Sequence, residues 1–347
     1  MTGNAEPAWA DWTDEALLNT RLCDLGISLP ETPVAPVIER LYTELDAAGL
    51  SLHPPCYFAD EWFSPGGIPA IAIPFYLAHP RLAQLERAQM LEVEGENESE
   101  CLKLLRHETG HALCHAYDLP RRASWRRVFG SPGREFREQY AYRPYSRRFV
   151  RHLANWYAQS HPEEDFAETF AVWLAPDSDW RSRYRGWPAL AKLTYVDGLM
   201  QRLRGRPSPP VSRDRPYAAA RLRKRLRTHY EERRRLYAED DPGFFDEDLK
   251  RIFPLAADPK QRRQAAAFLR REQIRLLNAA ARWTRERKFT VQRLLRKLAQ
   301  RCEELGLALP EDETGARLEF AACLTALVAN YAHTGRLKAG RRRRSRY

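Results

Sequence analysis

The sequence predicts an α+β fold that is mainly α, with a small sheet beside a long helix and an all-helical region after it. Apolar residues recur at helical spacing over most of the 347 residues, and only two short aromatic-rich runs resemble strands. Hydrophobic residues make up 44% and charged residues 30% of the chain. This balance is typical of globular proteins and excludes a disordered chain, a collagen-like chain and a coiled-coil rod.

Two amphipathic helices are expected between Asp14 and Gly49. In the second, Val37, Leu41 and Leu45 lie at helical spacing, and Gly49 follows its end.

Two strands are expected next. The runs 56–58 and 71–73 are short and apolar, and Ser-Pro-Gly-Gly at 64–67 separates them, which favours a hairpin. Pro69 and Pro74 place the second strand near a sheet edge.

The following segment holds the clearest helix of the chain. A short helix over 80–89 and an edge strand over 91–94 precede it. Asn97 can cap the helix, and Glu100 stands three residues later, as in a capping box. Helical spacing continues to about Tyr117.

A second well-marked helix begins at His161-Pro162, because proline favours the first helical position, and it ends near Leu174. A third covers 187–203. Further helices are expected in the C-terminal part, near 215–237, 244–252, 259–285, 289–305 and 314–333.

The charge distribution supports a division of the chain. Residues 1–210 carry 23 basic and 28 acidic residues, a net charge of −5, whereas residues 211–347 carry 34 and 18, a net charge of +16. The basic character of the chain therefore belongs to its C-terminal part. We expect four parts: a domain over 1–204, a Pro- and Ser-rich linker over 205–212, a basic helical accessory domain over 213–340 and a disordered Arg-rich tail over 341–347.

The sequence also predicts the cellular compartment of the protein. No run of about 18 apolar residues is present, so no membrane span is expected. The first twelve residues lack the basic start and apolar stretch of a secretory signal. The six cysteines are scattered, without a Cys-x-x-Cys pair. We therefore expect free thiols and a cytoplasmic protein.

The segment His107-Glu108-Thr109-Gly110-His111 carries the chemistry. Residues four apart lie on one face of a helix, so the imidazoles of His107 and His111 can reach one metal ion. Glu108 lies about 100° further round the helix, where it can accept a proton from a water instead of binding the metal. The alternative is an amphipathic helix with two ordinary histidines.

A third ligand is expected on the helix that begins at Pro162. A histidine ten residues after the first is excluded, because that position holds Tyr117. Glu164 and Glu168 are four apart, so one can bind the metal while the other accepts the second ring N–H of a ligating histidine. Helix phase favours this pair, but the residues alone do not choose among Glu163, Glu164 and Glu168.

Together, H-E-T-G-H at 107–111 and E-D-F-A-E at 164–168 resemble the gluzincin metallopeptidases, and within them the bacterial proteins described only as zinc-binding metallopeptidases. The resemblance covers about residues 67–203. It implies a zincin-like domain with an edge-stranded sheet over the H-E-x-x-H helix and one zinc ion per chain. It also implies Glu164 as the third ligand and Glu168 as its supporting acid, where several gluzincins have Asp.

The predicted function is therefore that of a zinc-dependent metallopeptidase. It would hydrolyse peptide or other amide bonds of a peptide or protein substrate by a metal-activated water, with Glu108 as the general base. The resemblance also suggests Tyr157 as the donor to the developing oxyanion. Tyr140, Tyr142 and Tyr145 compete for this role.

Two further features lie close to the motif. His115 is expected to be a packed or surface histidine, because it points away from the direction of His107. The resemblance implies that residues 67–76 form an edge strand that pairs with an extended peptide.

The alternative function is a non-catalytic zinc-containing binding protein whose basic helical C-terminal region binds nucleic acid or a protein partner. The arginine-rich stretches 221–227 and 341–346 could contact phosphates. Only eight of the 57 basic residues are lysine, and no nucleic-acid motif is present. A solvated or protein-binding surface is therefore favoured over nucleic-acid binding.

Overall fold

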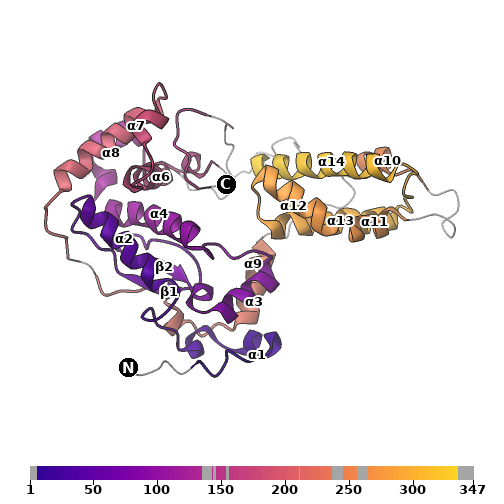
Figure 1. The fold of residues 1–347 in the computed structure, drawn as a ribbon, viewed down its shortest axis with the longest axis horizontal. Coiled ribbons are helices and arrows are strands. Elements are labelled where there is room, and N and C mark those ends of the chain that lie inside the picture. The colour runs from indigo at the N-terminus through magenta and orange to yellow at the C-terminus, as the bar shows by residue number, and fades with distance from the viewer. Residues whose placement is uncertain are drawn as a thin grey trace, which may run out of the picture. The chain divides into compact units, whose positions relative to one another are not determined.

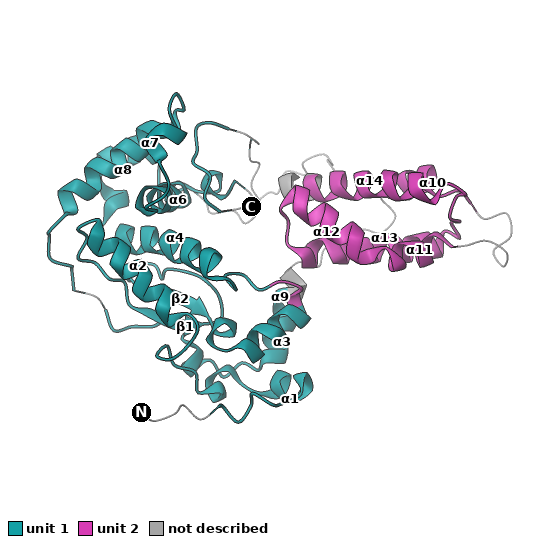
Figure 2. Ribbon diagram, in the orientation of Figure 1, with its two compact units in different colours: residues 1–89, 93–138, 142–233 teal, residues 90–92, 139–141, 234–347 magenta. Residues whose placement is uncertain are grey.

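The computed structural model describes residues 6–134, 143, 146–153, 156–210, 212–236, 245–255 and 264–334. Helices make up most of this part of the chain, and two short strands form one sheet, which confirms the predicted α+β, mainly α class (Figure 1). The chain divides into two compact units. Unit 1 comprises residues 1–89, 93–138 and 142–233, and unit 2 comprises residues 90–92, 139–141 and 234–347 (Figure 2).

Unit 1 holds the sheet and the two helices that carry the sequence motifs. Its helices are α1 (Asp14–Asn19), α2 (Ala35–Ala47), α3 (Pro80–Met90), α4 (Glu98–Ala116), α5 (Ala123–Phe129), α6 (Pro162–Leu174), α7 (Trp180–Arg183), α8 (Ala189–Leu203) and most of α9 (Leu226–Leu236). The side chain of Asn97 caps α4 by accepting the N–H of Glu100 at 2.9 Å. His161 caps α6 in the same way, with Pro162 at the first helical position.

The two strands are parallel, so the predicted hairpin is wrong. Strand β1 (Cys56–Ala59) pairs with β2 (Ile71–Pro74), with Cys56 opposite Ile71. The connecting residues 60–70 do not turn back directly, as a hairpin requires. They pass along the other edge of β2, where Phe63 and Ala72 exchange two backbone hydrogen bonds of 3.4 and 2.8 Å.

The expected free edge for a peptide substrate is therefore occupied at its centre. The backbone of Phe63 is hydrogen-bonded to the N–H and C=O groups of Ala72 that face away from β1. On the outer edge of β1, Ala218 forms a β-bridge to Ala59. The second expected edge strand, over 91–94, is also wrong. These residues form bends and a turn after α3, and Leu91 has a positive φ of 70° that ends the regular structure.

Helices α4 and α6 pack extensively against each other in unit 1, and their contact depends on a glycine. A Cβ placed on Gly110 would lie 2.7 Å from the Cα of Ala167, a backbone atom that cannot move aside. Small residues at both positions let the two helices approach each other. This approach brings the acids of α6 to the histidines of α4.

Replacing Gly110 with Ala is expected to lower the free energy of unfolding by about 1–3 kcal/mol, the usual cost of overpacking a core. Urea unfolding followed by circular dichroism measures this change. Gly198→Ala is the matched control: Gly198 also lies inside a helix, but the nearest atom to an added Cβ is the flexible end of Arg202 at 3.7 Å. The control should gain up to about 1 kcal/mol from helix propensity. Equal stability of Gly110→Ala and the wild type would contradict the role of this contact.

Unit 2 is helical throughout its described part. It contains α10 (Asp246–Ile252), α11 (Ala265–Arg271), α12 (Gln273–Thr284), α13 (Lys288–Glu304) and α14 (Glu313–Thr334). The large aromatic residues of its core are Phe245, Phe253, Phe268 and Phe320. The helix predicted over 259–285 is two helices, because Glu272 leaves helical geometry. Its buried carboxylate forms an ion pair with Arg317, whose Nε lies 3.1 Å from Oε2 of Glu272.

The compact units divide inside α9, between residues 233 and 234, and not at the linker predicted over 205–212. Residues up to Arg233 pack with unit 1: the His229 ring lies 5.3 Å from that of Phe75, and Arg233 binds the buried carboxylate of Glu86 at 2.8 Å. The predicted tail over 341–347 lies outside the described residues. No helix in the described ranges has both the length and the apolar character needed to cross a bilayer.

Candidate metal centre

Three side chains of unit 1 converge on one point. His107 and His111 project from adjacent turns of α4, and Glu164 projects from the first turn of α6. The Nε2 of His107 lies 3.0 Å from Oε2 of Glu164, and the Nε2 of His111 lies 3.1 Å from each of these two atoms. In the described part of the chain, these three are the group that could hold a metal ion.

The spacing of these atoms fits a single zinc ion. Ligand atoms that bind one tetrahedral ion at about 2.0–2.1 Å are separated by about 3.3 Å. The three atoms of His107, His111 and Glu164 form a triangle with slightly shorter sides, of 3.0–3.1 Å. Two imidazoles and one carboxylate are also the donor set of catalytic zinc sites, which leave a further position for water or substrate.

Glu168 fixes the orientation of His107. Its Oε1 lies 3.0 Å from Nδ1 of His107, and its Oε2 accepts the backbone N–H groups of His152 and Leu153 at 3.3 and 2.9 Å. The carboxylate has only acceptors, so Nδ1 of His107 carries the proton in this contact. In the neutral ring the lone pair is then on Nε2, which points at the metal-binding triangle.

The three atoms Nε2 of His107, Nε2 of His111 and Oε2 of Glu164 are stable this close together only if they share a positive charge. With Nδ1 of His107 protonated, the neutral ring presents a lone pair to the carboxylate oxygen of Glu164, and two acceptors at 3.0 Å repel each other unless a cation lies between them. Burial lowers the pKa of His107, but Glu164 and Glu168 raise it well above its usual value on balance. A proton or a metal ion satisfies this arrangement.

Glu108 is placed beside the triangle but is not part of it. Its side chain is buried, with 6% of the residue exposed, and its Oε2 has no hydrogen-bond partner among the described residues. Burial raises the pKa of Glu108, and the neighbouring His107 and His111 lower it, with a net rise. A buried carboxylate with an unused oxygen and a raised pKa is suited to take up a proton near neutral pH.

Tyr157 lies next to the centre. Its ring centroid is 5.6 Å from that of His107, and its residue opens the short 3-10 helix Tyr157–Gln159 just before α6. The competing tyrosines Tyr140, Tyr142 and Tyr145 lie outside the described residues.

His115 is separate from the metal-binding group. Its Nδ1 accepts the backbone N–H of Gly67 at 3.3 Å, and burial lowers its pKa to about 4. The ring is therefore neutral near pH 7 and packs as expected. Glu163, the remaining sequence candidate for the third ligand, is also outside the metal-binding group.

The sequence did not predict that residues 152 and 153 donate hydrogen bonds to Glu168. Both act through their backbone N–H groups, which every residue except proline possesses. No residue type marks such donors in a sequence. Only the path of the chain past Glu168 reveals them.

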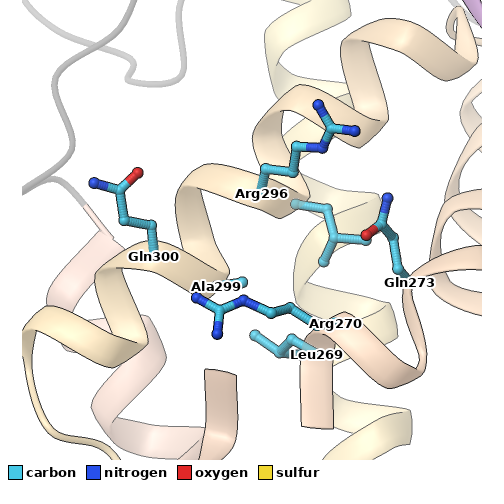
Figure 3. A pocket seen from close by; sticks show the side chains of 7 residues that line it. Leu269, Arg270, Gln273, Arg296, Ala299 and Gln300 are labelled. Carbon is cyan, nitrogen blue, oxygen red and sulfur yellow. The ribbon is translucent and has the colours of Figure 1, made fainter. Parts of the chain in front are cut away.

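A hollow of about 450 Å³ lies in unit 2, in the groove between α13 and the junction of α11 and α12 (Figure 3). It is lined by Leu269, Arg270, Gln273, Leu295, Arg296, Ala299 and Gln300. Its lining has no carboxylate, histidine or thiol, and it is remote in sequence from the metal-binding motif.

The fold is mainly helical, and its centre is a group of two histidines and one carboxylate that could hold a metal ion. Residues 82–178 match the model of a protein family described as "Putative zinc-binding metallo-peptidase". The matched segment includes the whole of α4 and α6, and it confirms the predicted resemblance to zinc-binding metallopeptidases. No match was found among curated proteins or among solved structures.

Proposed function

We propose that this chain is a zinc-dependent metallopeptidase of the gluzincin type, which hydrolyses peptide or other amide bonds of a peptide or protein substrate. One observation carries the proposal: the ligand atoms of His107, His111 and Glu164 lie 3.0–3.1 Å apart, with the buried carboxylate of Glu108 beside them. The family match supports it. The six free thiols support a reducing compartment, and we retain the cytoplasm as the proposed location.

His107, His111 and Glu164 would hold one zinc ion per chain. Bound zinc supplies a positive charge that lowers the pKa of a water to about 7 and polarises a carbonyl group. Glu108 accepts the proton of the attacking water at its free Oε2 and returns it to the leaving amine.

Glu168 keeps the ring of His107 in the tautomer that offers Nε2 to the ion. Tyr157 is proposed to donate its hydroxyl proton in a hydrogen bond to the oxygen that becomes negative during attack. The ring centroids of Tyr157 and His107 lie 5.6 Å apart, with the two ring planes tilted by 48°, and this proximity supports the proposed role.

Zinc removal and return test the proposal. The purified chain should contain about one zinc ion, measured by inductively coupled plasma mass spectrometry. A chelator should abolish cleavage of a peptide library, and one equivalent of zinc should restore it. A chain that binds zinc stoichiometrically yet cleaves no peptide would instead favour the predicted non-catalytic binding protein. A chain that binds no zinc after add-back would contradict both.

Tyr157→Phe is expected to lower kcat by about 100-fold, the typical cost of losing one oxyanion donor, with zinc content unchanged. Steady-state kinetics on the best library peptide measures this change. Tyr195→Phe is the control, because Tyr195 is an α8 residue whose hydroxyl bonds with Ser124 away from the centre. Unchanged kcat in Tyr157→Phe would assign the oxyanion donor to another group.

A further inference from the structure

The segment 150–153 supplies the backbone N–H groups that bind the carboxylate of Glu168. The segment is anchored at its start by Val150, which is 2% exposed in a small core of unit 1. Two residues on, the successive N–H groups of His152 and Leu153 both point at Oε2 of Glu168, at 3.3 and 2.9 Å. Two adjacent donors on one oxygen satisfy a buried carboxylate that also binds a histidine.

The side chain of His152 ties this segment to the metal-binding helix. Its Nε2 lies 2.9 Å from the backbone carbonyl oxygen of Lys103 in α4, to which it donates. Lys103 stands four residues before His107. In an α-helix the same carbonyl accepts the N–H of His107. The imidazole of His152 therefore contacts α4 at the start of the turn that ends with His107.

These contacts close a ring of interactions. The ring runs from His107 through Nδ1 to Glu168, from Glu168 to the N–H of His152, and from the imidazole of His152 to Lys103, one turn before His107. A shift of the 150–153 segment would move the donors to Glu168 and so change the orientation of the His107 ring.

We propose that His152 is a positioning residue of the metal centre: its ring N–H holds the 150–153 segment against α4, so that Glu168 keeps Nε2 of His107 aimed at the metal. The inference rests on the proposed function insofar as the centre binds zinc. His152 itself is outside the metal-binding group. Burial lowers its pKa, which favours the neutral ring with a single N–H, as a donor to a carbonyl requires.

Two variants of similar size separate the hydrogen bond from packing. His152→Gln retains an N–H donor near the position of Nε2, whereas His152→Met fills a similar volume without a donor. Both retain the backbone N–H to Glu168. His53→Met is the matched control, because His53 bonds with Asp46 on the surface, away from the centre.

Zinc affinity, measured by competition with a chromogenic chelator, is the first readout. Loss of a residue that orients a metal ligand typically weakens binding by about 10- to 100-fold. We expect His152→Met to bind zinc at least about 10-fold more weakly than the wild type, and His152→Gln to stay within about 3-fold. The proposal would be overturned if His152→Met bound zinc as tightly as the wild type. It would also be overturned if the zinc affinities of His152→Met and His152→Gln were reduced to the same extent.

A second readout needs no metal. In the metal-free protein with ¹⁵N-labelled histidine, the Nδ1 proton of His107 should exchange with solvent at least about tenfold faster in His152→Met than in the wild type or His152→Gln. If the wild type binds no zinc, the proposed function fails, but this comparison still decides the role of His152. The same exchange rate in all three proteins would refute the positioning role.

Discussion

Replacing Glu108 with Gln should leave zinc bound and reduce peptide hydrolysis by about 10²- to 10⁴-fold, the usual contribution of a general base. The amide has nearly the same shape as the carboxylate, but it cannot take up a proton at the attacked water. Glu108 is outside the metal-binding group, so the zinc ligands remain. Its Oε2 forms no hydrogen bond within the described residues that the amide would break.

The measurements are kcat on the best library peptide and zinc content of the same preparation. Glu100→Gln is the control, because it makes the same chemical change in the exposed first turn of α4, and it should retain full activity. Loss of zinc from Glu108→Gln would show that Glu108 holds the ion. Full activity in this variant would remove it from the mechanism.

The second large effect is expected for Glu164→Ala, which should weaken zinc binding by more than about 100-fold, beyond the upper range for residues that only orient a ligand. The change removes one of three ligand atoms and leaves two neutral imidazoles. The structure places Oε2 of Glu164 within 3.1 Å of both histidine Nε2 atoms. Chelator competition on the purified variant measures the loss.

Glu163→Ala is the matched control for this experiment. Glu163 is the preceding acid on α6 and lies outside the metal-binding group, so its removal should change zinc affinity less than about 3-fold, as for a residue that neither binds nor orients a ligand. Glu168→Ala should fall between the two, at about 10- to 100-fold. A larger loss in Glu163→Ala than in Glu164→Ala would reverse the assignment of the third ligand.

The helices of the centre could be predicted because their signals are local. Asn97 with Glu100, and His161 with Pro162, mark the starts of α4 and α6 through interactions within one turn. The pairing of His107 with His111 follows from the same helical repeat. These features need no knowledge of the rest of the chain.

The arrangement of the strands could not be predicted in this way. Two apolar runs with a Ser-Pro-Gly-Gly segment between them suit a hairpin as well as a parallel pair. Their direction depends on where residues 60–70 travel, and the bridge from Phe63 to Ala72 decides it. A contact between separate segments leaves no periodic pattern in the sequence.

The sequence by itself determined the two helices of the centre, α4 and α6, together with the histidine pair and the short choice of acids on α6. The tertiary structure decided which acid meets the histidines, because the approach of α6 to α4 at Gly110 and Ala167 sets the rotation and height of Glu164. It also decided what supports Glu168, since backbone N–H groups are common to nearly all residues and acquire a role only through their position in space.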